Sequence, residues 1–284
     1  MSQAPAPATP RTGYAPVNGL RMYYEIHGPD REDGGVPLLL LHGAYMTTGD
    51  FGPLLPGLAA GRQVVVCDLQ GHGRTGDADR PLTYEGMADD AAALLDHLGI
   101  ARADVVGFSL GGAVALQLAL RHQALVRALV PISASYRSDA MQPELLEMIP
   151  MITPEMFAGT PMEAGYRAVA PDPDRFPVLV GKLKELDETP FAWSEDAIRG
   201  IGCPTLIVVG DADAIRPEHA VELLRLLGGG GMGDLAGVGR ARLAILPGTT
   251  HFMPPGSGVL DRSEWLLPMI SDFLDGASDV PSGP

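Results

Sequence analysis

The chain has 284 residues, with 35 acidic against 20 basic side chains and a formal net charge of −15. That charge excludes nucleic-acid binding through a basic surface, and it disfavours polyanionic substrates and anionic membranes as partners. Because the chain has only two cysteines, it has neither a disulfide framework nor a thiolate zinc site.

Residues 1–12 are dominated by proline and alanine, and we expect them to form a disordered tail. They lack the basic and apolar regions of a signal peptide. No apolar run in the chain reaches the ~18–20 residues that a membrane helix needs. We therefore expect a cytoplasmic protein. A second disordered tail is expected over residues 277–284.

The central part of the chain has the pattern of an α/β protein. Residues 14–27 alternate polar and apolar side chains around Asn18-Gly19, which predicts a β-hairpin. Short apolar runs, typical of parallel strands buried on both faces, occur at 37–41, 63–67, 103–107, 126–132, 205–209 and 242–246. Helical spacing is found at 88–98, 112–121 and 218–227. Strands that alternate with helices predict a doubly wound, mostly parallel sheet.

This alternation stops between residues 136 and 201, where recurring prolines separate short helical pieces. The stretch is too long for an ordinary connection and too apolar for a disordered linker. We predict a helical cap over 136–201, inserted in a core of residues 13–135 and 202–276. Methionines crowd the first half of the cap. Such side chains favour an adaptable apolar pocket, although they could equally serve only to pack the cap on the sheet.

A candidate nucleophile lies in Gly107-Phe108-Ser109-Leu110-Gly111, which matches Gly-x-Ser-x-Gly. A predicted strand precedes this motif and a predicted helix follows it, which is the strand–turn–helix of a nucleophile elbow. The turn would place the serine hydroxyl above the carboxyl edge of the sheet. The alternative is a glycine-rich turn with an incidental serine.

A serine hydroxyl needs a base to remove its proton, and the base needs a carboxylate to orient it. Of seven histidines, His251 alone follows the last predicted strand, where a loop can reach Ser109. Asp211 and Asp213 both follow the fifth apolar run, and position alone allows either to orient the histidine. The order Ser, Asp, His along the chain is that of α/β-hydrolases.

Together these motifs resemble the α/β-hydrolase superfamily, in its capped esterase- and lipase-like branch. Two further motifs join the resemblance: His42-Gly43-Ala44 after the first apolar run, and residues 68–73 after the second. The similarity extends over residues 14–274. The elbow carries serine rather than aspartate, so the resemblance to haloalkane dehalogenases and epoxide hydrolases stops at the fold.

The resemblance implies roles for individual residues. The usual Gly-x-x-Asp spacing of the family selects Asp213 as the acid. The backbone amides of Ala44 and Leu110 would form the oxyanion hole, where two converging N–H groups stabilise a tetrahedral intermediate. His42 would shape its loop rather than act as a base, and residues 68–73 would brace the site. The chemistry of the fold needs no cofactor and no metal.

The sequence thus predicts a serine hydrolase with Ser109, His251 and Asp213 as catalytic residues. Its expected substrate is a small to medium, neutral, fairly apolar carboxylic ester, cleaved through an acyl-enzyme. Lactonase, perhydrolase or acyltransferase activity, or carbon–carbon bond hydrolysis, would use the same residues, and some proteins of this fold are non-catalytic ligand receptors. The physiological substrate and the oligomeric state stay open. Candidate substrate-binding residues are Tyr45, Met141, Met148, Met151 and Phe157.

Overall fold

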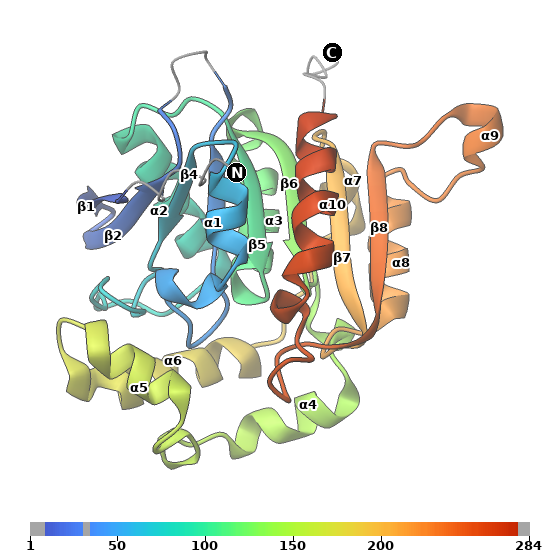
Figure 1. Ribbon diagram of the computed structural model, residues 1–284. Helices are drawn as coiled ribbons and strands as arrows, with labels where there is room; N and C mark the ends of the chain where they lie inside the picture. Colours follow the sequence, from blue (N-terminus) through green and yellow to red (C-terminus); the bar gives the residue numbers. More distant parts are fainter. Residues whose placement is uncertain (1–8, 31–34, 278–284) are drawn as a thin grey trace, which may run out of the picture.

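The computed structural model describes residues 9–30 and 35–277, built around one eight-stranded sheet (Figure 1). The strand order is β1-β2-β4-β3-β5-β6-β7-β8; β1 and β2 are antiparallel to their neighbours and the other pairs are parallel. The predicted doubly wound, mostly parallel sheet is therefore confirmed. The strands are β1 (Arg11–Val17), β2 (Leu20–His27), β3 (Leu38–Leu41), β4 (Val64–Cys67), β5 (Ala103–Phe108), β6 (Val126–Ile132), β7 (Thr205–Ala212) and β8 (Ala241–Thr250).

Helices cover both faces of the sheet because the central strands are apolar on both sides. In β3, Leu39 and Leu41 belong to the buried cluster on one face of the sheet, and Leu38 and Leu40 belong to the cluster on the other face. All four leucines are fully buried. The helices are α1 (Leu54–Ala59), α2 (Tyr84–His97), α3 (Leu110–Arg121), α4 (Pro143–Met148), α5 (Pro161–Val169), α6 (Phe176–Glu188), α7 (Glu195–Arg199), α8 (Pro217–Leu226), α9 (Gly233–Ala236) and α10 (Ser263–Asp275).

The N-terminal hairpin forms as predicted. Strands β1 and β2 meet at Asn18 and Gly19, whose φ angles of 47° and 83° suit a tight hairpin turn. The predicted tail, however, ends earlier than residue 12. Arg11 and Thr12 belong to β1, where Arg11 pairs with Ile26 of β2. Residues 1–8 of the predicted tail lie outside the described residues.

The C-terminal end is also more ordered than predicted. Helix α10, which the sequence pattern did not reveal, packs beside α1 on one face of the sheet (Figure 1). Ala277, where we placed the start of the second tail, is buried, and its carbonyl accepts a hydrogen bond from Arg127 Nη1 at 2.8 Å. The rest of that predicted tail, 278–284, falls beyond the described part of the chain.

Between β6 and β7 the chain forms four helices, α4 to α7. Figure 1 shows α4, α5 and α6 beyond the end of the sheet where the parallel strands finish. Each of α4, α5 and α6 has a proline in its first turn. Proline is tolerated there because the backbone N–H that it lacks would have no hydrogen-bond partner within the helix. These helices occupy the place expected of the cap, whose boundaries at 136 and 201 stay a prediction.

A cluster of polar contacts holds α6 against the core. Lys182 Nζ contacts the Asp77 carboxylate at 2.8 Å and donates to the carbonyl groups of Ala78 and Arg80, both at 2.8 Å. The helix therefore has a fixed position over the carboxyl edge of the sheet, and a cavity lies between them. Within the described residues, no helix has both the length and the apolar character to span a membrane.

Candidate active site

Ser109 lies on a sharp turn between β5 and α3. Its φ of 53° and ψ of −117° are strained for a residue with a side chain. Its N–H donates to the Ile132 carbonyl at 2.9 Å, which fixes the turn against β6. A Cβ at Gly111 would collide with the carbonyl oxygens of Leu41 and His42, so only glycine lets helix and strand approach this closely. This packing directs Ser109 Oγ into the cavity.

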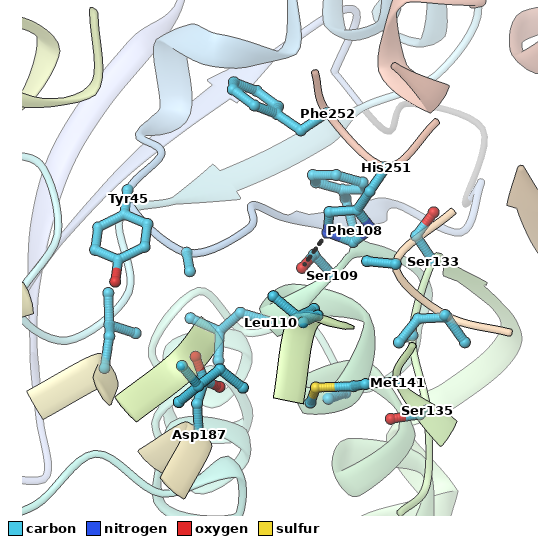
Figure 2. Close-up of a pocket in the computed structure, with 18 of the residues that line it drawn as sticks. Tyr45, Phe108, Ser109, Leu110, Ser133, Ser135, Met141, Asp187, His251 and Phe252 are labelled. Carbon is cyan, nitrogen blue, oxygen red and sulfur yellow. Dashed lines mark hydrogen bonds between the residues drawn. The ribbon is translucent and has the colours of Figure 1, made fainter. Parts of the chain in front are cut away.

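A chain of hydrogen bonds joins three of the predicted residues. His251 Nε2 is 3.0 Å from Ser109 Oγ, a contact that Figure 2 shows, and His251 Nδ1 is 2.7 Å from Asp213 Oδ1. A carboxylate can only accept, so Nδ1 carries the hydrogen and Nε2 is free to accept from the serine hydroxyl. That tautomer is the one a general base requires.

The Asp213 carboxylate is held by several donors inside the protein, where its residue is 2% exposed. Its Oδ2 accepts from Ser133 Oγ at 2.6 Å and from the Gly210 N–H at 3.1 Å, and its Oδ1 accepts from the Ile215 N–H at 3.1 Å. Burial by itself raises the pKa of Asp213, but the contacts with His251, Ser133 and Gly210 outweigh it and hold that pKa below its ordinary value. The group therefore stays ionised.

Asp211, the other candidate left open by position, has a different role in the structure. Its carboxylate is exposed and accepts a hydrogen bond from the Thr249 N–H at 3.0 Å. Strand β7 ends at Ala212, so Asp211 belongs to the strand whereas Asp213 lies in the loop that follows it. The structure brings Asp213, and not Asp211, to His251.

The two predicted oxyanion donors border the same cavity as Ser109 and His251. Leu110 is the first residue of α3, where backbone N–H groups have no partner within the helix and the macrodipole is positive. Ala44 precedes Tyr45, whose φ of 63° turns the chain sharply at this point. Both positions suit a donor to a developing negative charge on a bound carbonyl oxygen.

His42 is buried away from the cavity and connects two loops. Its Nδ1 donates to the Gly43 carbonyl at 2.8 Å, and its Nε2 accepts from the Leu69 N–H at 3.0 Å. Burial lowers the pKa of His42 to about 4, so the ring is neutral.

Asp68 stabilises the same region by accepting hydrogen bonds from the N–H groups of Thr48 and Arg74, both at 2.7 Å. These contacts shape the loop that carries Ala44.

The cavity has a volume of about 300 Å³ and is lined mainly by apolar side chains. Four predicted substrate-binding residues, Tyr45, Met141, Met148 and Phe157, line it (the first two are labelled in Figure 2). The fifth was wrong: Met151 is 62% exposed and lies outside the cavity. The chain tightens into a 3₁₀ turn after α4 (η4, Ile149–Met151), which turns the buried Ile149 inward and Met151 outward.

Other lining residues were not predicted. Ser133 directly follows β6 at the carboxyl edge of the sheet. Its position after a predicted strand could have identified it as a site residue. Tyr84, Asp187 and Phe191 also line the cavity, but only the folded arrangement of α2 and α6 brings them there. In the part of the chain that the structure describes, no three His, Cys, Asp or Glu side chains come together to hold a metal ion.

Comparison with known proteins indicates the family to which the chain belongs. A family model described as alpha/beta hydrolase fold matches residues 36–176. The pimeloyl-[acyl-carrier protein] methyl ester esterase of Neisseria meningitidis is 29% identical, over 86% of this chain and 78% of the relative. The dihydrolipoyllysine-residue acetyltransferase component of the acetoin cleaving system of Pseudomonas putida is 35% identical over 52% of this chain. The solved structure of carboxylesterase CesB from Bacillus subtilis superposes with a TM-score of 0.72 at 18% identity, over 95% of this chain and 93% of that chain.

The matches differ in how much of each protein they cover. The chain spans 46% of the length of the putative carbamate hydrolase RutD of Azorhizobium caulinodans, which is 36% identical over 44% of this chain, and 38% of the length of the Pseudomonas putida relative. At 18% identity, the CesB structure shows a shared fold. The family-model match, the order of the strands and the serine turn after β5 all agree. The chain belongs to the α/β-hydrolase superfamily.

Proposed function

We propose that the protein is a serine hydrolase that cleaves a carboxylic ester through an acyl-enzyme. One observation carries the proposal: the continuous hydrogen-bond chain from Ser109 through His251 to the buried carboxylate of Asp213. The three residues come from separate loops at the carboxyl edge of the sheet, so their alignment is a property of the whole fold. A hydroxyl, a neutral imidazole and an ionised carboxylate in this order activate a serine for acyl transfer.

The geometry supports a two-step reaction. Ser109 Oγ attacks the acyl carbon while His251 Nε2 takes its proton, and Asp213 stabilises the imidazolium that forms. The N–H groups of Ala44 and Leu110 donate to the oxygen of the tetrahedral intermediate. His251 then gives the proton to the leaving alcohol. A water molecule, deprotonated by His251, attacks the acyl-enzyme and releases the acid and the free serine.

The cavity supports a small to medium ester with a mainly apolar body. Its volume of about 300 Å³ is at the lower end for small-molecule sites. Tyr45, Met141, Met148 and Phe157 offer apolar surface close to Ser109, and methionine adapts to ligands of varied shape. The Neisseria relative is named as a methyl ester esterase, which agrees with ester cleavage here.

The proposal is tested by labelling with a fluorophosphonate beside a panel of esters and lactones. We expect the wild type to be labelled and the Ser109→Ala variant to stay unlabelled, with kcat lower by about three orders of magnitude or more. Ser135, another serine that lines the cavity (Figure 2), provides a matched control, because Ser135→Ala should keep the label. A folded Ser109→Ala variant that retains near-wild-type ester turnover would refute the proposal.

A further inference from the structure

Asp187 places a carboxyl group in the otherwise apolar cavity. It lies in the last turn of α6 and lines the same cavity as Ser109 and His251 (Figure 2). Among the residues that the structure describes, none forms a hydrogen bond or an ion pair with this carboxyl. The nearby lysines of α6 are engaged elsewhere: Lys182 with Asp77, and Lys184 with the Pro150 carbonyl. Asp187 therefore faces the cavity without a partner.

This position is unfavourable for the fold itself. Burial raises the pKa of Asp187 to about 7, because the surroundings disfavour the charged form. A negative charge in the last turn of a helix also opposes the macrodipole. No contact within the described residues offsets these costs. A residue that breaks local rules without compensation is expected at a functional site rather than in a structural one.

Two pairs of aromatic rings line the same cavity as Asp187. Tyr45 packs on Phe157 with ring centroids 4.6 Å apart, and Tyr84 packs on Phe191 with centroids 4.8 Å apart. Burial first, and then the negative charge of Asp187, raise the pKa of both tyrosines. The Tyr45 hydroxyl is buried and has no hydrogen-bond partner within the described structure.

We propose that Asp187 and these four rings bind a positively charged group, so that the preferred ester carries a protonated amine away from the bond that is cleaved. An ammonium group would provide the positively charged partner that the Asp187 carboxylate lacks, and its N–H groups would donate hydrogen bonds to the carboxylate oxygens. Aromatic faces attract cations, most strongly where water is excluded. The ammonium can also donate to the unpaired Tyr45 hydroxyl oxygen. This inference rests on the proposed function and narrows its substrate.

Binding can be measured without turnover, which separates this inference from the proposed function. The probes are n-hexylammonium and n-hexanol, compared by calorimetry on the wild type and on two variants. We expect the wild type to bind the ammonium about tenfold or more tightly than the alcohol, a preference that Asp187→Asn abolishes. Glu188→Gln removes a neighbouring exposed charge of the same helix and should keep the preference.

Two outcomes would overturn the inference: tighter binding of hexanol by the wild type, or an ammonium preference that survives in Asp187→Asn. If esters are turned over, the same ratio is measured as kcat/KM for two acyl chains of equal length, one ending in an ammonium and one in a methyl group. If no ester is turned over, the proposed function fails, while the binding measurement still decides the role of Asp187.

Stability against pH distinguishes a ligand-binding role from a structural one. Below the ordinary aspartate pKa of about 4, Asp187 is protonated in both the folded and the unfolded chain and contributes nothing. As the pH rises towards 7, the unfolded chain ionises more readily, so the wild type loses stability. Asp187→Asn should therefore melt at a higher temperature than the wild type at pH 8 and at the same temperature at about pH 3. A less stable variant at pH 8 would assign Asp187 a structural role instead.

Discussion

Asp211 and Asp213 are two residues apart, and their contacts differ completely. Asp213 is buried and orients His251, whereas Asp211 is exposed and accepts one backbone N–H from Thr249. Sequence position alone could not separate them, because both follow the end of the same apolar run. The spacing typical of the family selected Asp213, and the geometry of the site agrees with that choice.

The two aspartates should therefore respond differently to neutralisation. Asp213→Asn replaces an acceptor of the His251 proton with a group that favours the wrong tautomer, and we expect kcat to fall by up to ~10⁴. Asp211→Asn weakens one exposed backbone contact and should change kcat little. Measurement of kcat and melting temperature for both variants checks this. A large loss of kcat in Asp211→Asn alone would assign the orienting role to Asp211.

Individual site residues were predictable from the sequence where they directly follow a predicted strand. Ser109 follows the buried strand β5 and His251 follows β8, and the carboxyl ends of parallel strands meet at one edge of a sheet. Asp187 does not follow a strand, so its sequence position gave no indication of its place in the cavity. It lies in a helix whose position over the sheet depends on tertiary contacts such as that of Lys182 with Asp77. Met151 was wrong for a related reason, since the orientation of a side chain after α4 depends on a local 3₁₀ turn.

At the level of elements, the parallel strands were the most predictable part of the fold. The central strands β3, β4 and β5 are short, mainly aliphatic runs buried on both faces, a pattern that tertiary context rarely overrides. Helices α1 and α10 were not predicted, and both contain proline: Pro56 in α1 and Pro268 in α10. Proline normally ends a helix, so the apolar face that packs these two helices on the sheet was obscured in the sequence.

The close contact between α3 and the end of β3 requires glycine at position 111, and this requirement can be tested. Gly111→Ala places a Cβ against the carbonyl groups of Leu41 and His42, which cannot move without disturbing β3. We expect a loss of about 2 kcal/mol or more in the free energy of unfolding, together with a lower kcat because Ser109 shifts. Chemical denaturation and ester turnover measure the two effects.

A second glycine provides the control for this experiment. Gly181 lies inside α6, and a Cβ there would meet nothing within 4 Å. Gly181→Ala should therefore raise stability by about 0.5–1 kcal/mol, since alanine restricts the unfolded chain more than glycine does. If Gly111→Ala proves as stable as Gly181→Ala, the close packing of the serine turn is not required.

At the scale of the whole molecule, the site is formed by two parts of the chain that meet over the sheet. The core supplies Ser109, His251 and Asp213 together with cavity residues such as Tyr45 and Tyr84, and the helices between β6 and β7 supply others, among them Met148 and Asp187. In the proposed reaction, the reacting groups thus lie in the core, whereas the residues that would contact the substrate come from both parts of the chain. Changes in these helices can alter substrate preference without touching the hydrogen-bond chain.

The net charge of −15 acts on substrates before they reach this cavity. A strongly acidic protein attracts cations and repels anions, and added salt screens both effects. For esters of matched size, we expect kcat/KM to fall with rising salt for an ammonium ester, to rise for a carboxylate ester, and to stay level for a neutral one. Steady-state rates between about 20 and 500 mM NaCl test this, a range over which the screening length shrinks several-fold.

The Asp187→Asn variant separates this long-range attraction from local recognition. It removes only one of the excess negative charges, so the dependence of kcat/KM on salt should persist almost unchanged. The preference for the ammonium ester at high salt should instead disappear, because a contact inside the cavity is screened far less than the surface field. If high salt alone abolishes the ammonium preference in the wild type, the preference comes from the overall charge and not from Asp187.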